Sequence, residues 1–212
     1  MTRIVKSPEE RKAELIEVAT KLFFEKGYNE TTVRDIIKAI NGSQGMFYHY
    51  FSSKDEIYHA VMNEYINKYI NGLNDISQNI ELSFFERIIR ILKEFKKTYN
   101  TCLNIKNYSN NPENIYFNLE LKERILHDMV IIIDRLIQDG IEYKIINPEI
   151  IVNQDTKKIA DYIANGIYGI INCDINNKSD IEEVNDRTIK EVLVYSFRVL
   201  GINENQVNNM IF

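Results

Sequence analysis

Side chains that can hydrogen-bond to a polyanion or to base edges gather in one short stretch, between Thr32 and Lys54. The centre of this stretch is a predicted helix over residues 44–50, which begins with Gln44 and Gly45 and continues with aromatic side chains. A glycine at this place lets a phosphate or a base edge approach the backbone. Small and hydrogen-bonding residues at a helix N-terminus are typical of helices that enter the major groove of DNA by that end.

The flanking residues predict the elements that position this helix. Thr32 and Asp35 have the spacing of a capping box at the start of a preceding helix. Apolar residues then follow at helical spacing and form one face: Val33, Ile36, Ile37 and Ile40. Asn41 and Gly42 tolerate a positive φ, so the chain can turn there. Ser53, with a glutamate three residues on, predicts the start of the next helix.

Residues that could carry catalysis or bind a metal are scattered along the chain. Cys102 and Cys173 are far apart and match no metal spacing; they are interpreted as buried or half-buried thiols, with a redox pair as the alternative. The histidines are isolated from one another: His49, His59 and His127. The sequence contains no nucleophile motif and no phosphate loop. We therefore expect no metal site, no cofactor and no catalytic residue, and the chain is not expected to be an enzyme.

Composition predicts a folded protein built from long elements. Of the 212 residues, 44% are hydrophobic, which is enough for a substantial core, and only 3 are proline. No stretch is apolar enough to span a membrane and the N-terminus lacks a signal peptide, so a cytoplasmic protein is expected. The net charge of −5 lies in residues 61–212, because residues 1–60 hold 9 basic and 9 acidic residues. An N-terminal part without excess acid remains compatible with DNA binding through a modest basic surface.

Periodicity and capping signals along the chain predict helices and no strand. The expected helices cover residues 8–26, 32–40, 44–50, 54–71, 82–99, 113–118, 119–139, 155–171 and 181–200. The short sixth helix either runs on into the seventh or bends away from it. The predicted fold is all-α, with a three-helix helix-turn-helix domain at 1–53 and a larger helical domain at 54–212.

The run from Phe47 to Glu56, Phe-Tyr-His-Tyr-Phe-Ser-Ser-Lys-Asp-Glu, resembles the end of the helix-turn-helix in the tetracycline-repressor (TetR) family of bacterial regulators. Upstream residues match the first helix of that family and the Gly-Tyr pair that ends it: Ala19, Leu22, Phe23, Gly27 and Tyr28. The resemblance covers about 50 residues in order. Two positions depart from the family pattern, because Gly42 replaces a small apolar residue and Met46 replaces a small polar one.

The resemblance implies a set of DNA contacts at matching positions: Thr32, Ser43, Gln44, Gly45, Met46, Tyr48, His49 and Lys54. Thr32 and Lys54, at helix N-termini, are expected to bind phosphates. Gln44 is expected to pair with adenine or another base edge, and Met46 to touch a thymine methyl group. Tyr48 and His49 can donate to phosphates or reach a base. For each residue the alternative is an ordinary surface position, and for Tyr48 it is packing against Phe51.

The resemblance also implies a ligand-binding and dimerising C-terminal domain. Aromatic and apolar residues on the middle helices are candidates for a ligand pocket, with the core as the alternative: Phe95, Tyr99, Tyr116, Phe117, Met129, Tyr162 and Tyr168. The last two long helices, 155–171 and 181–200, carry extra apolar residues and are expected to form the homodimer; the alternative is two buried helices of a monomer. The implied function is a repressor that reads a pseudo-palindromic operator in double-stranded DNA and is released by an unknown small-molecule effector. The alternative is a ligand-independent helix-turn-helix protein that acts through a protein partner.

Overall fold

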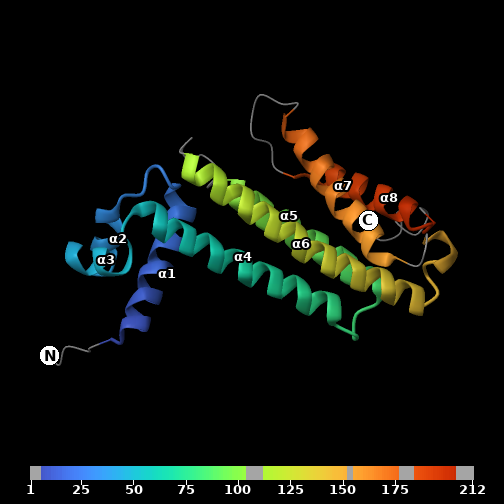
Figure 1. Cartoon of the computed structure of the whole chain (residues 1–212), viewed down its shortest axis with the longest axis horizontal. Helices are drawn as coiled ribbons and strands as arrows, with labels where there is room; N and C mark the ends of the chain where they lie inside the picture. Colours follow the sequence, from blue (N-terminus) through green and yellow to red (C-terminus); the bar gives the residue numbers. More distant parts are fainter. Residues whose placement is uncertain (1–5, 104–111, 152–154, 177–183, 204–212) are drawn as a thin grey trace. The chain divides into compact units, whose positions relative to one another are not determined.

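The computed structural model describes residues 6–103, 112–151, 155–176 and 184–203. Within these ranges the chain forms α-helices, one short 3-10 helix and no strand (Figure 1), so the predicted all-α fold is confirmed. The α-helices are α1 (Pro8–Lys26), α2 (Val33–Ala39), α3 (Gln44–Tyr50), α4 (Lys54–Gln78), α5 (Phe84–Leu103), α6 (Pro112–Glu142), α7 (Thr156–Asn176) and α8 (Asp186–Val199). None of the described helices is both long and apolar enough to cross a membrane.

The chain divides into two compact units, and the boundary lies inside α4. Unit 1 comprises Met1–Lys68 and Thr101–Leu121, and unit 2 comprises Tyr69–Asn100 and Lys122–Phe212. The sequence places the boundary earlier, at 53/54, where α4 begins. The first turns of α4 belong to unit 1 because they pack on α1: the ring of Tyr58 lies 5.8 Å from that of Phe23. The long helix α4 therefore continues from one unit into the other.

Unit 1 is built from segments with their own start and stop signals. Ser7 caps α1 with a complete capping box to Glu10, and Thr32 caps α2 in the same way with Asp35. The observed bounds of α1 and α3 coincide with the predicted ones. One apolar side of each helix faces a common core of fully buried side chains, which includes Leu15, Ala19, Phe23, Ile36, Phe47 and Ile57.

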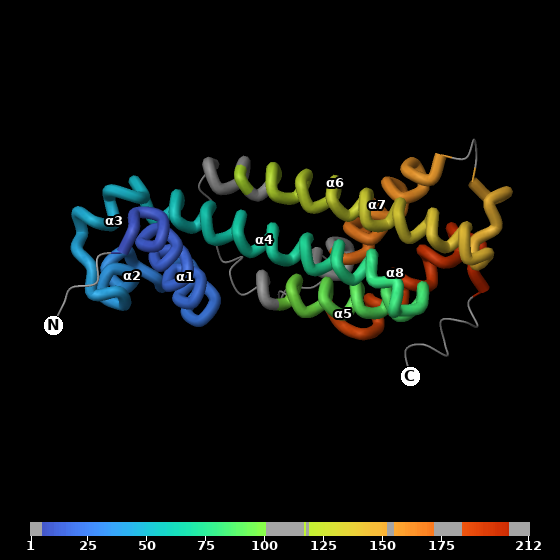
Figure 2. The backbone as a smooth tube through the Cα atoms, turned by 90° about the horizontal axis from the view of Figure 1, so that it is seen from below, coloured from blue at the N-terminus to red at the C-terminus, as the bar shows by residue number. Residues whose placement is uncertain are grey.

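Unit 2 is a helical bundle in which α7 and α8 pack against each other (Figure 2). Its core is formed by apolar residues of α4, α5, α6, α7 and α8, including Leu73, Phe84, Ile132, Ile137, Ala160 and Phe197. These buried stripes explain why helices with many charged residues are stable here, because an amphipathic helix is held by its buried face more than by its intrinsic propensity.

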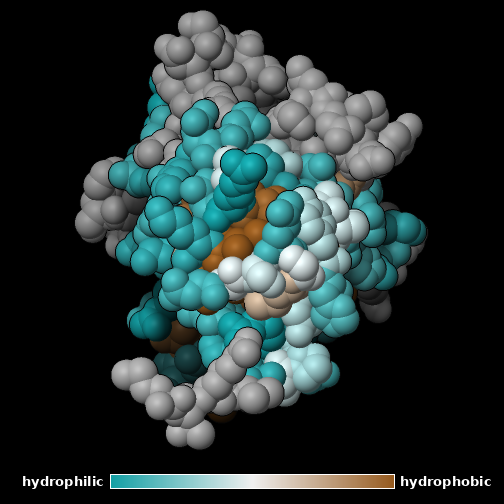
Figure 3. Space-filling model, turned by 90° about the vertical axis from the view of Figure 1, so that its left-hand side faces the viewer, coloured by the Kyte–Doolittle hydropathy of each residue, from teal (hydrophilic) through white to brown (hydrophobic). Residues whose placement is uncertain are grey.

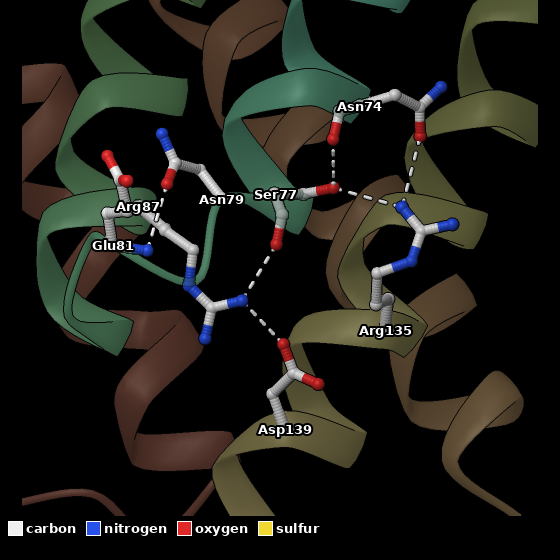
Figure 4. Close-up of polar contacts among 7 residues, drawn as sticks. All are labelled: Asn74, Ser77, Asn79, Glu81, Arg87, Arg135 and Asp139. Atoms are coloured by element: carbon white, nitrogen blue, oxygen red, sulfur yellow. Dashed lines mark hydrogen bonds and ion pairs between the residues drawn. The ribbon is translucent and has the colours of Figure 1, made fainter.

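Two arginines hold the last turn of α4 within unit 2 (Figure 4). Arg87 of α5 is 2% exposed, and its Nη1 donates to the carbonyl oxygen of Ser77 at 2.7 Å and to the carboxylate of Asp139 at 2.5 Å. Arg135 of α6 donates to the side chains of Asn74 at 3.2 Å and Ser77 at 3.0 Å. Cations are favourable at a helix C-terminus, where carbonyl groups lack intrahelical partners.

Several helices are longer than the sequence predicts. α4 runs to Gln78, beyond the predicted end at residue 71, because Leu73 is fully buried and the arginines bind the following turn. α6 is one continuous helix over Pro112–Glu142, where a break near residue 119 was an open alternative. α7 continues to Asn176, so the loop predicted for 172–180 begins later.

Gly140 shows why the predicted end of α6 at residue 139 was wrong. The helix passes through Gly140, where an added Cβ would lie 2.5 Å from Ile146 Cδ1 and 3.1 Å from Phe84 Cε2. Gly140 therefore lets Ile146 and Phe84 pack closely against α6, and the chain turns only at Lys144, whose φ is 58°.

The last helix of unit 2 is shorter than predicted within the described residues. α8 begins at Asp186 after the N-cap Asn185, five residues later than predicted. Residues 181–183 of the predicted helix lie outside the described ranges. The side chains of Cys102 and Cys173 lie outside the described part of the chain as well, so the interpretation of both as buried or half-buried thiols stays a prediction.

Candidate nucleic-acid interface

The turn between α2 and α3 sets the direction of α3. Asn41 takes the positive φ, at 49°, and the Gly42 N–H donates to the carbonyl of Ile37 at 2.9 Å. Ser43 then caps α3, because its hydroxyl accepts from the Met46 N–H at 3.2 Å. The predicted turn is therefore present, and its left-handed residue is the asparagine. A side chain that hydrogen-bonds locally makes asparagine one of the few residues suited to this conformation.

The two sides of α3 have different surroundings. Phe47 is fully buried and packs on Phe51, with 6.0 Å between ring centres. Gln44, Tyr48 and His49 are exposed, and half of the Tyr48 surface is accessible. Figure 3 views the face that carries α2 and α3, where an apolar patch is bordered by hydrophilic side chains. The helix thus presents hydrogen-bonding groups outward from a rigid apolar support.

Met46 and Gly42, the two departures from the TetR pattern, are neighbours in the structure. A Cβ added to Gly42 would lie 2.5 Å from Met46 Cε and 3.3 Å from Ile40 Cδ1. Met46 is only half-exposed, so its thioether fills the space left by the missing side chain at position 42. Methionine suits such irregular gaps because it is unbranched and flexible. The tip of Met46 therefore packs against the turn, and its contact with a thymine methyl group stays a prediction.

We expect Gly42→Ala and Met46→Ala to be strongly non-additive. With Met46 present, the new methyl group displaces the thioether, and overpacking typically costs about 1–3 kcal/mol. With Met46→Ala in place, Gly42→Ala should instead stabilise by about 0.4–1 kcal/mol, because it restricts the unfolded chain. Urea unfolding of the four proteins of this cycle measures the coupling. Effects that add to within about 0.5 kcal/mol would contradict the contact.

Thr32 and Lys54 have their polar groups engaged within unit 1. Both the N–H and the hydroxyl of Thr32 donate to Asp35 Oδ2, at 2.9 and 2.7 Å. These bonds lower the pKa of the Asp35 carboxyl. The ammonium group of Lys54 donates to the carbonyls of Tyr28 and Thr31, both at 3.0 Å. Two of the three N–H bonds of this ammonium group are therefore used inside the protein.

Lys54 also takes part in a small aromatic cluster at the end of α1. Its Nζ lies 4.0 Å from the centre of the Tyr28 ring, and the Tyr28 hydroxyl donates to Asp55 at 2.5 Å. Burial lowers the pKa of Lys54, while the charges of Asp55 and Glu30 act in the opposite direction. These contacts fix the start of α4 to the end of α1, a structural role that the sequence did not reveal.

Side chains of α2 and α3 line a concave surface that encloses about 530 Å³. Seven residues line it: Thr32, Val33, Arg34, Ile37, Lys38, Gln44 and Tyr48. Arg34 and Lys38 are exposed, and sequence reasoning missed both of them. The available signal was their spacing, because residues four apart on a helix lie on the same side. Gln44 and Tyr48, predicted separately as DNA contacts, are brought together here with these two cations.

The predicted ligand pocket stays a prediction, and its residues that the structure describes have different surroundings. An apolar cavity of about 70 Å³ lies among α5, α6, α7 and α8 in unit 2, and among the predicted residues it is lined by Met129 alone. Phe117 lies in unit 1, where its ring stacks on His59 at 3.9 Å. Tyr162 is 68% exposed, and the side chain of Tyr116 lies outside the described part of the chain.

Three further predicted pocket residues lie elsewhere in unit 2. Phe95 and Tyr99 stack along α5 with their ring centres 5.8 Å apart. Burial raises the pKa of Tyr99 to about 12, and nearby Tyr168 adds to this shift. Lys122 lies over the Tyr168 ring, 4.5 Å from its centre. None of these three residues lines the cavity around Met129.

Large apolar side chains are exposed on α7 and α8. Tyr162, Tyr195 and Val199 are 68%, 51% and 38% exposed, whereas hydrophobic residues on the other sides of both helices are buried. Next to Tyr162 along α7, Gly166 and Gly169 have open space beside them, with no heavy atom within 4 Å of an added Cβ. Exposed aromatic groups beside uncovered small residues are features of surfaces that bind another protein.

The geometry of unit 1 defines a class of protein. A capped helix, a tight turn and a second helix that exposes hydrogen-bonding residues form a helix-turn-helix DNA-binding domain. Residues 15–61 match the family model described as bacterial regulatory proteins, tetR family. Residues 15–61 are therefore similar to the DNA-binding domain of the tetR family.

Relatives of this chain carry names consistent with that family. It is 44% identical over 59 residues to the uncharacterized HTH-type transcriptional regulator YuxN of Bacillus subtilis (strain 168), covering 28% of this chain and 20% of YuxN. It is 41% identical over 63 residues to the HTH-type transcriptional repressor KstR2 of Rhodococcus jostii (strain RHA1), covering 28% and 31%. These matches span less than a third of either relative.

A solved structure extends the similarity of the fold to most of the chain. The transcriptional regulator from Cytophaga hutchinsonii ATCC 33406 aligns with a TM-score of 0.69 at 19% identity, covering 88% of this chain and 93% of the other. At this identity the match concerns the fold. The helical architecture of both units is therefore one that a known regulator also has.

Proposed function

We propose that this protein is a sequence-specific transcriptional repressor that binds an inverted-repeat operator as a homodimer and leaves it when a small-molecule ligand binds. The observation that carries the proposal is the two-sided α3, which buries Phe47 and exposes Gln44 and Tyr48. Glutamine can pair with adenine in the major groove, and the tyrosine hydroxyl can donate to a phosphate or a base. The names of the relatives support regulation and repression. The proposed location is the cytoplasm, where a bacterial regulator meets its DNA.

The proposed DNA contacts are those at the positions matching the family: Thr32, Ser43, Gln44, Gly45, Met46, Tyr48, His49 and Lys54. Gln44 and Tyr48 are the principal members, because both are exposed and both line the concave surface between α2 and α3. Met46 and Lys54 are secondary, since the tip of one packs on the turn and the ammonium group of the other binds two carbonyls.

The proposed dimer forms through α7 and α8. Their exposed side carries Tyr162, Tyr195 and Val199 beside two glycines with open space. A two-fold axis through such a face would pair each helix with its own copy, which is the usual symmetry of soluble dimers. A dimer would supply two copies of α3, one for each half-site of an inverted repeat.

The size of the cavity in unit 2 supports a second candidate function. Its volume of about 70 Å³ is well below the roughly 300–1,000 Å³ of pockets that hold drug-sized ligands. Release of the protein from its operator by a ligand of that size thus requires the cavity to enlarge around Met129. The second candidate is a DNA-binding protein that responds to no small molecule and acts through a protein partner.

The test is selection of binding sites from a random pool of duplex DNA with the purified protein at near-physiological salt. We expect an inverted repeat, and Gln44→Ala should relax base preference at one position of each half-site, where a good contact discriminates by about 1–3 kcal/mol. Gln138→Ala provides a matched control, since Gln138 is an exposed glutamine of unit 2 that binds Asp134. It should select the same sequence as the wild type.

Three outcomes would argue against parts of the proposal. If the folded protein enriched no sequence, specific DNA binding would be excluded. If Gln44→Ala retained the wild-type preference, Gln44 would not read a base. If sedimentation of the same sample gave a monomer, the dimer through α7 and α8 would be rejected.

A further inference from the structure

The short helix α2 carries two exposed cations on one side. Arg34 and Lys38 are four residues apart, and neither side chain takes part in a hydrogen bond or a salt bridge among the described residues. Two other basic residues of unit 1 are engaged, because Lys6 and Arg11 both bind Glu14, at 2.6 Å each. The charges of Arg34 and Lys38 are therefore available to an external anion.

The surface around these two cations is suited to a polyanion. Arg34 and Lys38 line the concave surface from the α2 side, and Gln44 and Tyr48 line it from the α3 side. None of the seven residues that line it is acidic, and apolar side chains of α2 complete it. Cationic groups thus lie along one wall and hydrogen-bonding groups along the other, which is chemically complementary to a chain of phosphates.

The residues that the family resemblance assigns to phosphates are less available. Thr32 gives both its N–H and its hydroxyl to Asp35, and Lys54 gives two N–H bonds to carbonyls of unit 1. Arginine binds phosphate with two parallel hydrogen bonds, and lysine acts as a point charge. Thr32 and Lys54 therefore keep fewer free hydrogen-bond donors for a phosphate than the side chains of Arg34 and Lys38 do.

We propose that Arg34 and Lys38 are the main phosphate anchors, each binding the backbone of one operator strand as it passes between α2 and α3. The inference rests on the proposed function and names the contacts that orient α3 in the groove. Contacts to phosphate fix register without reading sequence, whereas Gln44 on the opposite wall faces the bases. Arg34 and Lys38 therefore set the affinity of the protein, and α3 sets its specificity.

The salt dependence of DNA binding tests this assignment. The slope of log K against log salt is about 0.9 for each phosphate that a basic side chain neutralises. The variant Arg34→Gln/Lys38→Gln removes two cations from each subunit, so the slope of a dimer should be smaller by about 3.6 on a duplex selected by the wild type. The sequence selected by the variant should stay the same. The charge-keeping variant Arg34→Lys/Lys38→Arg should retain the wild-type slope.

Lys21→Gln is the matched control. Lys21 is exposed on α1, outside the concave surface, and its substitution should leave the slope unchanged. Far-UV circular dichroism of each variant checks that the helices remain folded. An unchanged slope for Arg34→Gln/Lys38→Gln, or a changed selected sequence, would overturn the assignment.

Failure of the proposed function gives a different result. If the wild type binds duplex DNA without sequence preference, specific recognition is excluded. The slopes of log K against log salt for the wild type and the variants still decide whether Arg34 and Lys38 bind phosphates. If it binds no duplex DNA at all, both are overturned.

Discussion

Replacing Arg87 with methionine is expected to destabilise unit 2 by about 3 kcal/mol, the lower end of the range for removing one partner of a buried ion pair. Arg87 is 2% exposed, and one nitrogen serves both the Ser77 carbonyl and the Asp139 carboxylate (Figure 4). Methionine fills a similar volume but leaves both oxygens without this donor. The lower end applies because the Asp139 side chain is 25% exposed and keeps some contact with water.

Two further variants separate the effect of charge from the effect of packing. Asp139→Asn leaves Arg87 buried with a neutral partner and should also destabilise. The double variant should be less unstable than the sum of the two, with a coupling of about 1–3 kcal/mol for groups in direct contact. Arg90→Met, on the same helix but exposed, should change stability by no more than about 0.5 kcal/mol.

Urea unfolding followed by circular dichroism gives these free energies, and hydrogen exchange resolved by peptide locates them. We expect faster exchange in α5 and in the last turn of α4 for Arg87→Met. Equal stability of Arg87→Met and Arg90→Met would show that the buried guanidinium contributes nothing beyond its volume.

Phe47→Ala should abolish DNA binding by unfolding α3. Phe47 is fully buried, and truncating a buried phenylalanine to alanine costs about 3–5 kcal/mol. α3 has only 7 residues, so it cannot remain helical without this anchor. We expect hydrogen exchange in α2 and α3 to increase while α7 and α8 of unit 2 stay protected.

Two substitutions test whether the effect acts through folding. Phe47→Leu keeps an apolar side chain in the core and should retain DNA binding with a modest decrease in stability. Tyr48→Ala, at the exposed neighbouring position, should leave stability nearly unchanged but weaken DNA binding. If Phe47→Ala left α3 protected and DNA bound, the buried side of α3 would not be its support.

The local sequence predicted the helices of unit 1 well, because the residues at their ends are themselves capping or turn residues. Helix caps are formed by Thr32 with Asp35 and by Ser43, and the turn is made at Asn41. All of these contacts are within a few residues along the chain. Helix ends in unit 2 depend on partners far along the chain. Nothing near residue 71 shows that α4 continues; its last turn is held by arginines from α5 and α6.

The exposure of single side chains in the candidate site was predictable from the sequence. Contacts between side chains and distant parts of the chain were less predictable. The exposed positions Gln44 and Tyr48 follow from helical spacing beside buried Phe47. The engagement of Lys54 by two carbonyls depends on how α1 meets α4, which no local pattern encodes. The aromatic pocket stays a prediction. Its residues depend on distant partners in the same way, because Phe117 and Met129 lie on one helix but belong to different units.

The contact between Gly42 and Met46 has a consequence for how such sequences diverge. Because Met46 fills the space beside Gly42, the size of the residue at either position limits the size that fits at the other. Across sequences that share this turn, residue size at the two positions should covary inversely. If an ancestor had a larger residue at position 42, methionine at position 46 would fit only after position 42 had changed to glycine. Packing therefore constrains the order of the two substitutions.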